Sequence, residues 1–153
     1  MYLFNVRVYG ILIDAQDRVL VSDERTQSVS FTKFPGGGLE YGEGLIDALK
    51  REFIEECNLE IEIVQHLYTT DFYEKSSFNN SQIISIYYLV KAIGPLEITL
   101  KDKPMDFDTL NTIEKEEVFR LIKCTELSNE HLTFKTDQVA WREYQKTRNL
   151  PNN

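Results

Sequence analysis

Alternating apolar and polar residues at the start of the chain predict two β-strands. The segments Leu3 to Asp14 and Arg18 to Asp23 are rich in β-branched residues and alternate in hydrophobicity. A period of two places successive side chains on opposite faces of a strand. The polar turn Asp14-Ala15-Gln16-Asp17 separates the two segments, so the sequence predicts an antiparallel hairpin.

A helical pattern follows between residues 44 and 58, whose sequence is GLIDALKREFIEECN. The segment contains no proline and few β-branched residues. Its apolar side chains recur at helical spacing, at Leu45, Ile46, Leu49 and Phe53. Asparagine is the residue, after glycine, that most readily takes the left-handed conformation in which many helices end. We therefore expect one helix that ends at Asn58.

Two further strands are expected at Glu60 to Tyr73 and at Gln82 to Ala92, because both segments are rich in β-branched and aromatic residues. The polar segment Lys75 to Ser81 lies between them. We interpret it as the loop of a longer hairpin, so this part of the chain forms a second β unit.

The last third of the chain first loses this regularity and then regains it. From Gly94 to about Lys115 the residues follow neither period, and we predict an ordered, irregular loop of the kind that is often functional. A short strand is expected at Val118 to Ile122. An amphipathic helix is expected at Asp137 to Lys146.

The composition is that of an ordinary soluble protein with one domain. The 153 residues are 42% hydrophobic and 27% charged, which is enough for a core and too short for two comfortable domains. We therefore treat residues 1–153 as a single domain. The net charge of −8 repels nucleic acids and anionic membranes, so a protein of this kind that handles phosphates needs bound cations or a local basic cluster.

Two cysteines, Cys57 and Cys124, are too few and too far apart for a secreted disulfide framework. We interpret both as reduced thiols in the core. The amino terminus has no basic leader before its apolar stretch, and no apolar run reaches the length of a membrane span. The sequence therefore predicts a cytoplasmic protein.

Three glutamates on the predicted helix at residues 44–58 are the strongest candidates for chemistry. Glu52, Glu55 and Glu56 share an arc of about 100° on one side of the helix, at the edge of its apolar stripe. Like charges at this spacing repel one another unless a cation lies between them. Hard divalent cations such as Mg²⁺ prefer carboxylate and backbone carbonyl oxygens. Five of the seven glycines lie just before the helix, between Gly36 and Gly44, and we expect a loop there that admits a diphosphate.

The spacing of these residues resembles the Nudix box of the Nudix hydrolase superfamily. Gly37 is followed after five residues by Glu43, and after seven more by Arg51-Glu52-Phe53-Ile54-Glu55-Glu56-Cys57-Asn58-Leu59. The preceding FPGG sequence at residues 34–37 also matches. The resemblance implies an α/β fold, an α/β/α sandwich around a mixed β-sheet. Phe53 and Asn58 depart from the usual branched aliphatic residue and glycine of the family, which affects packing and not the chemistry.

The resemblance also implies an activity, the Mg²⁺-dependent or Mn²⁺-dependent hydrolysis of a nucleoside diphosphate linked to another group X. By position in the motif, the metal ligands would be Glu52, Glu55, Glu56 and the carbonyl of Gly36. Arg51 would orient the glutamates through charge-assisted hydrogen bonds. Glu43 is expected to be structural.

Further candidates lie outside the box. Family members often take a general base from elsewhere, and the acidic run Glu114, Glu116 and Glu117 is the best candidate region, with Glu117 as our choice. Arg25 and Lys33 precede the glycine cluster and are candidate phosphate contacts. Aromatic residues that could stack on a nucleobase are Phe72, Tyr73, Phe78 and Phe107.

Two other functions are weighed against this one. A regulatory domain that only binds nucleotide ligands would not need three repelling carboxylates. An enzyme acting on the 5′ end of RNA would be expected to carry a basic tract, which this chain lacks. The sequence favours a small nucleotide-derived substrate. It leaves open ADP-ribose, nucleotide sugars, dinucleotide polyphosphates and nucleoside triphosphates, the number of metals, and whether the protein is a monomer or a homodimer.

Overall fold

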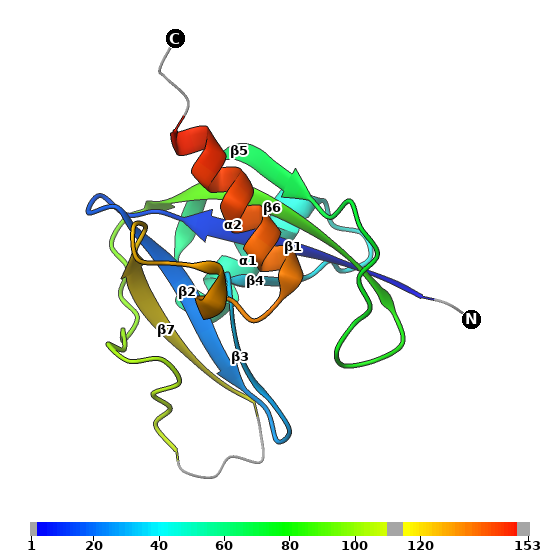
Figure 1. Cartoon of the computed structure of the whole chain (residues 1–153). Helices are drawn as coiled ribbons and strands as arrows, with labels where there is room; N and C mark the ends of the chain where they lie inside the picture. The colour runs from blue at the N-terminus through cyan, green and yellow to red at the C-terminus, as the bar shows by residue number, and fades with distance from the viewer. Residues whose placement is uncertain (1–2, 110–114, 150–153) are drawn as a thin grey trace.

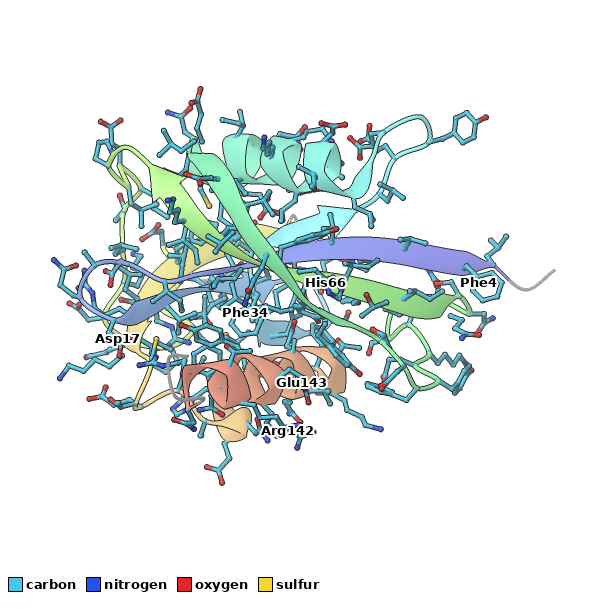
Figure 2. All side chains as sticks on the ribbon, turned by 90° about the horizontal axis from the view of Figure 1, so that it is seen from above. Phe4, Asp17, Phe34, His66, Arg142 and Glu143 are labelled. Carbon is cyan, nitrogen blue, oxygen red and sulfur yellow. The ribbon has the colours of Figure 1, made fainter. Side chains whose placement is uncertain are left out.

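The computed structural model describes residues 3–109 and 115–149, and in this part of the chain two β-sheets lie between two helices (Figures 1 and 2). The strands are β1 (Phe4–Leu12), β2 (Arg18–Arg25), β3 (Ser30–Lys33), β4 (Gly36–Gly38), β5 (Glu60–Thr69), β6 (Gln82–Ile93) and β7 (Glu116–Lys123). The helices are α1 (Leu45–Cys57), a short 3₁₀ turn η1 (Asn129–His131) and α2 (Lys135–Arg148).

The larger sheet is mixed and has the strand order β4-β1-β6-β5. Strand β1 pairs in parallel with β6 and antiparallel with β4, while β5 and β6 form an antiparallel pair. The smaller sheet is antiparallel, with the order β3-β2-β7. Helix α1 packs on β1, β4 and β5, and α2 packs on β5 and β6 from the other side. The predicted α/β fold with a mixed sheet is confirmed.

The predicted hairpin between the first two strands is wrong. Strands β1 and β2 belong to different sheets, and one isolated bridge between Ile13 and Val19 joins them. The turn between them exists, since the Asp14 N–H donates to the carbonyl of Arg18 over 2.9 Å. Both edges of β1 are already occupied by β4 and β6. Alternation therefore predicted the strands, but it could not predict their partners.

The helix predicted at the motif is confirmed over Leu45–Cys57. Asn58 takes the left-handed conformation with φ of 47°, and its N–H donates to the carbonyl of Ile54. Phe53 is completely buried in the core. The phenylalanine at this position, where the family usually has a branched aliphatic residue, fits because Gly10 on β1 has no side chain. A Cβ at Gly10 would lie 2.7 Å from the Phe53 ring.

The elements predicted after the motif helix are present in the structure, but their ends differ from the prediction. The β5–β6 hairpin, the strand at β7 and the final helix are all present, each with shifted ends. Part of the predicted glycine loop is strand β4, which pairs with β1. The four-residue strand β3 was missed, because so short a segment carries too little alternation to be seen. The predicted irregular loop has no helix or strand at residues 94–109, and residues 110–114 lie outside the described part of the chain.

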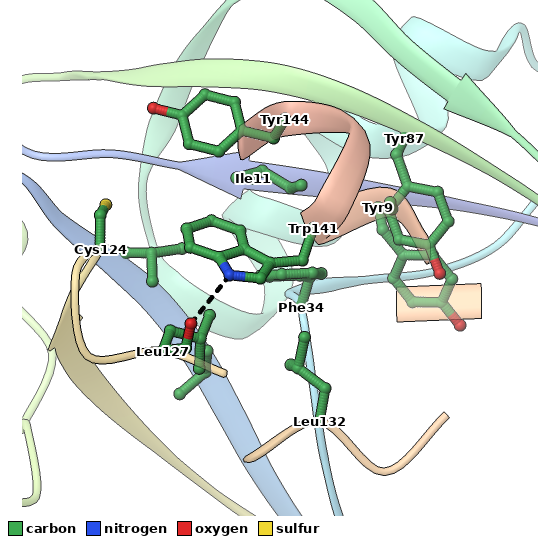
Figure 3. Packing of buried hydrophobic residues seen from close by; sticks show 12 residues of the cluster. Tyr9, Ile11, Phe34, Tyr87, Cys124, Leu127, Leu132, Trp141 and Tyr144 are labelled. Carbon is green, nitrogen blue, oxygen red and sulfur yellow. Dashed lines mark hydrogen bonds between the residues drawn. The ribbon is translucent and has the colours of Figure 1, made fainter. Parts of the chain in front are cut away.

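Two hydrophobic cores lie on opposite sides of β1. Val8 and Leu12 face α1, while Tyr9 and Ile11 face α2, as the pleat of a strand requires. The core on the α2 side contains Trp141, which is 1% exposed. Its indole N–H donates to the carbonyl of Leu127 over 3.0 Å (Figure 3).

Both cysteines are buried and unpaired, as predicted. Burial raises the pKa of the Cys57 thiol to about 12 and that of Cys124 to about 11, so both stay protonated near neutral pH. Among the described residues, neither helix combines the length and the apolar character that crossing a membrane would require.

Candidate active site

Arg51 on helix α1 is the centre of a hydrogen-bond network within the motif. Its Nε and Nη2 donate to the two carboxylate oxygens of Glu43 over 3.0 and 2.6 Å. Its Nη1 donates to Glu52 over 3.0 Å and to Glu55 over 3.2 Å. Nη2 also reaches the carbonyl of Gly38 over 3.1 Å. One guanidinium therefore connects the glycine strand, the following turn and helix α1.

Glu43 holds this guanidinium in place. The hydrogen bonds from Arg51 lower the pKa of the Glu43 carboxyl to about 2, and the N–H of Glu40 adds a further hydrogen bond of 2.8 Å. Arg51 in turn has its pKa raised, first by the hydrogen bond with Glu43. These contacts agree with the interpretation of Glu43 as a structural residue.

Glu52 lies directly against the glycine strand. A Cβ atom at Gly37 would lie 2.4 Å from Oε1 of Glu52, so any side chain at position 37 would displace the carboxylate. Gly36 has φ of 142°, and its carbonyl accepts a hydrogen bond of 3.2 Å from Nζ of Lys33. The glycines of the motif are therefore needed here for close approach and for backbone conformation.

Glu56 turns away from this network and meets two glutamates of the smaller sheet. One carboxylate oxygen from each of Glu24, Glu56 and Glu117 lies within 4.8 Å of the others. Glu24 on β2 and Glu117 on β7 are directly opposite each other in the antiparallel register. Ser22 donates to Glu117 over 2.6 Å. We call these three residues the carboxylate cluster.

The three glutamates of α1 are thus divided between two sets of contacts. Arg51 holds Glu52 and Glu55, and the latter side chain is 58% exposed. Glu56 lies on the other side of the arc and faces the smaller sheet. The helical spacing placed all three on one side, but only the fold decides what each of them meets.

Burial dominates the electrostatics of the carboxylate cluster. It raises the pKa of Glu56 to about 7, with further increases from the charges of Glu117, Glu52 and Glu24 and an opposing effect from Lys33. The pKa of Glu117 is also raised, first by burial. Burial alone would lower the pKa of Lys33, but the surrounding carboxylates raise it overall. The buried ammonium of Lys33 lies 2.9 Å from Oε1 of Glu24.

The donor set of the cluster fits a hard divalent cation. All three side chains offer carboxylate oxygens, and Oε2 of Glu56 is buried without a hydrogen-bond partner. A buried carboxylate oxygen without a partner is energetically costly, and a cation would remove that cost. The observation favours a metal ligand at Glu56 over a simple solvated charge.

Sequence reasoning missed Glu24. Leu20, Ser22 and Glu24 alternate along one face of β2, and the predicted strand ended at Asp23, two residues before the end of β2 at Arg25. Extending the alternation by a single residue would have placed Glu24 in the sheet. The run Ser22-Asp23-Glu24-Arg25 is polar throughout, so the end of the strand could not be recognised from hydrophobic alternation.

The two candidate phosphate contacts have different surroundings. Lys33 belongs to the carboxylate cluster through its ion pair with Glu24. Arg25 instead pairs with Glu116 over 2.8 Å, donates to Thr109 and lies 4.5 Å from the centre of the Phe107 ring. Arg25 thus anchors the irregular loop to the sheet. Glu114, the remaining acid of the predicted run, lies outside the described residues.

A cavity of about 330 Å³ opens beside the cluster, and Glu24 and Lys33 belong to its wall. Its volume lies within the range of small-molecule sites. The phenylalanine rings that line it are Phe31, Phe78 and Phe134. Of the four aromatic residues proposed for base stacking, Phe78 lines this cavity, whereas Phe72 lies under the ammonium of Lys135 and Phe107 under Arg25.

Asp137, in the first turn of α2, also belongs to the wall of the cavity. It is 1% exposed, and its Oδ1 accepts a hydrogen bond of 2.7 Å from the hydroxyl of Tyr87. Burial raises the pKa of this carboxyl to about 7. The wall of the cavity therefore contains two buried carboxyl groups, Glu24 and Asp137, together with three phenylalanine rings.

The structure thus combines an α/β sandwich with a helix of glutamates beside a glycine strand, as the resemblance to the Nudix hydrolases implies. The NUDIX domain profile matches residues 3–141, so the chain belongs to the Nudix family. No curated protein sequence matches the chain significantly.

Solved structures agree with this assignment at the level of the fold. The MutT protein from Methanosarcina mazei superposes with a TM-score of 0.70 at 12% identity, over 97% of this chain and 98% of that one. The ORF135 protein of E. coli gives 0.68 at 16% identity, over 97% and 93%. An ADP-ribose pyrophosphatase from Streptococcus suis gives 0.59 at 13% identity, over 96% of both chains.

Proposed function

We propose that this protein hydrolyses a diphosphate bond in a nucleoside diphosphate linked to X, with Mg²⁺ or Mn²⁺ as cofactor. The observation that carries the proposal is the buried carboxylate cluster, in which Glu56 of the Nudix box has an oxygen without a hydrogen-bond partner. The adjoining cavity provides space for a nucleotide-sized ligand. Cluster and cavity together support a metal-dependent site for a small phosphate ester or anhydride.

The cation would be held by oxygens from the Nudix box and from the smaller sheet. The proposed ligands of the box are Glu52, Glu55, Glu56 and the carbonyl of Gly36. Glu24 is a further candidate because it shares the cluster with Glu56. When bound, a divalent ion would polarise the phosphate of the substrate and lower the pKa of a bound water. Arg51 keeps Glu52 and Glu55 in position through its charged hydrogen bonds.

Glu117 is proposed as the general base. Burial raises its pKa above the ordinary value of a glutamate, which is the direction that favours acceptance of a proton. Ser22 fixes one of its oxygens with a hydrogen bond. In this arrangement Glu117 accepts the proton of the attacking water, while the neighbouring ammonium of Lys33 balances part of the negative charge.

The proposed substrates are nucleotide-derived and small. Structural relatives at low identity include proteins named as an ADP-ribose pyrophosphatase and a UDP-X diphosphatase, and both names describe a nucleoside diphosphate joined to another group. The three phenylalanines of the cavity could bind a base or another flat group. The reduced, buried state of both cysteines supports the cytoplasm as the compartment.

The first experiment measures hydrolysis of a nucleotide panel with Mg²⁺ and with Mn²⁺, with the products identified by chromatography. Glu56→Gln should lower kcat/KM by roughly 100-fold or more, because it removes a charged ligand from the proposed metal site. Glu62→Gln is the matched control, since Glu62 is an exposed glutamate of β5 that pairs with Lys91. Circular dichroism should be the same for all three proteins. Undiminished Mg²⁺-dependent turnover in Glu56→Gln would contradict the proposal.

A second experiment tests the base. The pH dependence of kcat should lose its acidic limb in Glu117→Gln, because amide side chains do not accept a proton in this range. Glu56 should not supply this limb in the Mg²⁺-loaded enzyme, because a carboxylate that binds a metal is deprotonated. An acidic limb identical to that of the wild type would remove Glu117 from this role.

A further inference from the structure

Arg7 on β1 is a charged side chain that the proposed chemistry does not use. It is half-buried and lines the cavity. Three other arginines of similar or greater burial, Arg25, Arg51 and Arg120, each pair with a carboxylate. Among the described residues, no carboxylate lies within ion-pair distance of Arg7. A half-buried cation without an anionic partner is costly, and in a protein of net charge −8 its persistence suggests an anionic ligand.

A buried tyrosine fixes one edge of this guanidinium. Nε of Arg7 donates to the hydroxyl of Tyr9 over 2.5 Å. Tyr9 is 7% exposed and stacks on Tyr87 at a centroid distance of 5.3 Å (Figure 3). No hydrogen bond from Nη1 or Nη2 is found within the described residues. The two terminal nitrogens therefore form a preorganised fork whose donors are available to a ligand.

The fork lies beside strand β4 as well as on the wall of the cavity. Arg7 is directly opposite Gly38 in the β1–β4 register, and a Cβ at Gly38 would lie 3.9 Å from Nη1. Gly38 follows the residue against which Glu52 lies. The charges of Glu24 and Glu52 both act on the guanidinium, so Arg7 is near these acids without pairing with either.

Lys33 cannot supply this positive charge in place of Arg7. Its ammonium is already engaged by Glu24 and by the carbonyl of Gly36. Lys115, another cation on the cavity wall, is 52% exposed and pairs with Glu24 as well. Lys75, a further cation of the wall, is exposed. Among the described residues of the wall, Arg7 is therefore the cation that combines burial with unused donors.

We propose that Arg7 binds phosphate oxygens of the substrate from the wall of the cavity, which it shares with Glu24 of the carboxylate cluster. This inference rests on the proposed function, because it places the diphosphate between the guanidinium and the metal ligands. A planar guanidinium matches two oxygens of a phosphate, whereas an ammonium offers a single point charge. Tyr9 is then a positioning residue that acts through Arg7.

The test measures binding of inorganic pyrophosphate by calorimetry, once in EDTA and once with Ca²⁺, together with steady-state hydrolysis of the best nucleotide in the panel. Arg7→Gln should weaken pyrophosphate binding by about 10-fold to 100-fold, the loss expected for charged hydrogen bonds. Arg7→Lys keeps the charge and loses the fork, so its affinity should fall between those of Arg7→Gln and the wild type. Arg18→Gln is the control, because Arg18 pairs with Asp14 away from this cavity.

Tyr9→Phe provides a second variant that keeps Arg7 and the stacked ring. It should raise KM several-fold and leave kcat nearly unchanged, because it frees the fork without removing it. A purely structural role for Tyr9 would instead lower the melting temperature with no change in KM.

Pyrophosphate affinity in a folded Arg7→Gln equal to that of the wild type would overturn the proposal. So would a wild-type protein that binds no pyrophosphate under either condition. Failure of the proposed function looks different. In that case the wild type would bind pyrophosphate through Arg7 but hydrolyse no nucleotide of the panel.

Discussion

Asp137 should make the stability of the protein fall as the pH rises through the neutral range. Burial raises the pKa of its carboxyl from 3.8 to about 7 in the folded protein. The folded state therefore binds this proton more tightly than the unfolded state. The stabilisation is fully present below the unfolded pKa and is lost as the pH rises toward the folded pKa. Between pH 5 and pH 8 the loss from this single group amounts to about 3 kcal/mol as an upper limit.

The variant that tests this is Asp137→Asn, which is nearly isosteric and cannot ionise. The Oδ1 of the asparagine can still accept a hydrogen bond from the hydroxyl of Tyr87, so this hydrogen bond is preserved. Urea unfolding at pH 5 and at pH 8 gives the free energy of unfolding for both proteins. Trp141 reports the transition, because it is the single tryptophan of the chain and lies one turn along α2 from Asp137.

Other titrating groups, Glu56 among them, contribute in both proteins and cancel when the two pH differences are compared. The wild type should lose up to about 3 kcal/mol more than Asp137→Asn over this range. Equal losses in the two proteins would show that Asp137 titrates normally, and the reasoning from its burial would then be wrong.

Three further predictions concern the site and the core. Gly37→Ala should lower activity strongly, because its Cβ would lie 2.4 Å from Glu52, whereas Gly38→Ala, with 3.9 Å to the nearest atom, should keep activity in the same assay. Excess Mg²⁺ at about 100 times its Kd should stabilise the wild type by about 2.7 kcal/mol, seen as a higher melting temperature. The same rise in Glu56→Gln would contradict a metal site there. Arg120→Met should cost about 3–5 kcal/mol in urea unfolding, because it leaves the buried Asp23 without its ion pair, and a double variant that also changes Asp23 to Asn should recover part of the loss.

The helix of the motif could be predicted from the sequence because its signals are local. The spacing of Phe53 and its apolar neighbours, and the left-handed residue Asn58, lie within a few turns of one another. The pairing of β1 could not be predicted in the same way. Its partner β6 is about eighty residues away, and alternation along one strand carries no information on which strand lies beside it.

The candidate site shows the same limit. The box residues were identified from their spacing, but Glu24 came to the carboxylate cluster through the register of β2 with β7. Arg7 carried no signal at all, since an arginine in an alternating strand is expected to be a solvated charge. Its importance depends on the absence of a carboxylate nearby among the described residues, and that is a property of the folded protein.

The alternation of β1 separates two kinds of tolerance to mutation. Asn5, Arg7 and Tyr9 line the cavity, while Val8 and Leu12 support the helix that carries the glutamates. Substitutions at Asn5 therefore change the wall of the cavity and leave the guanidinium of Arg7 and the packing of α1 in place. A laboratory search for altered substrate choice begins with a library restricted to that codon.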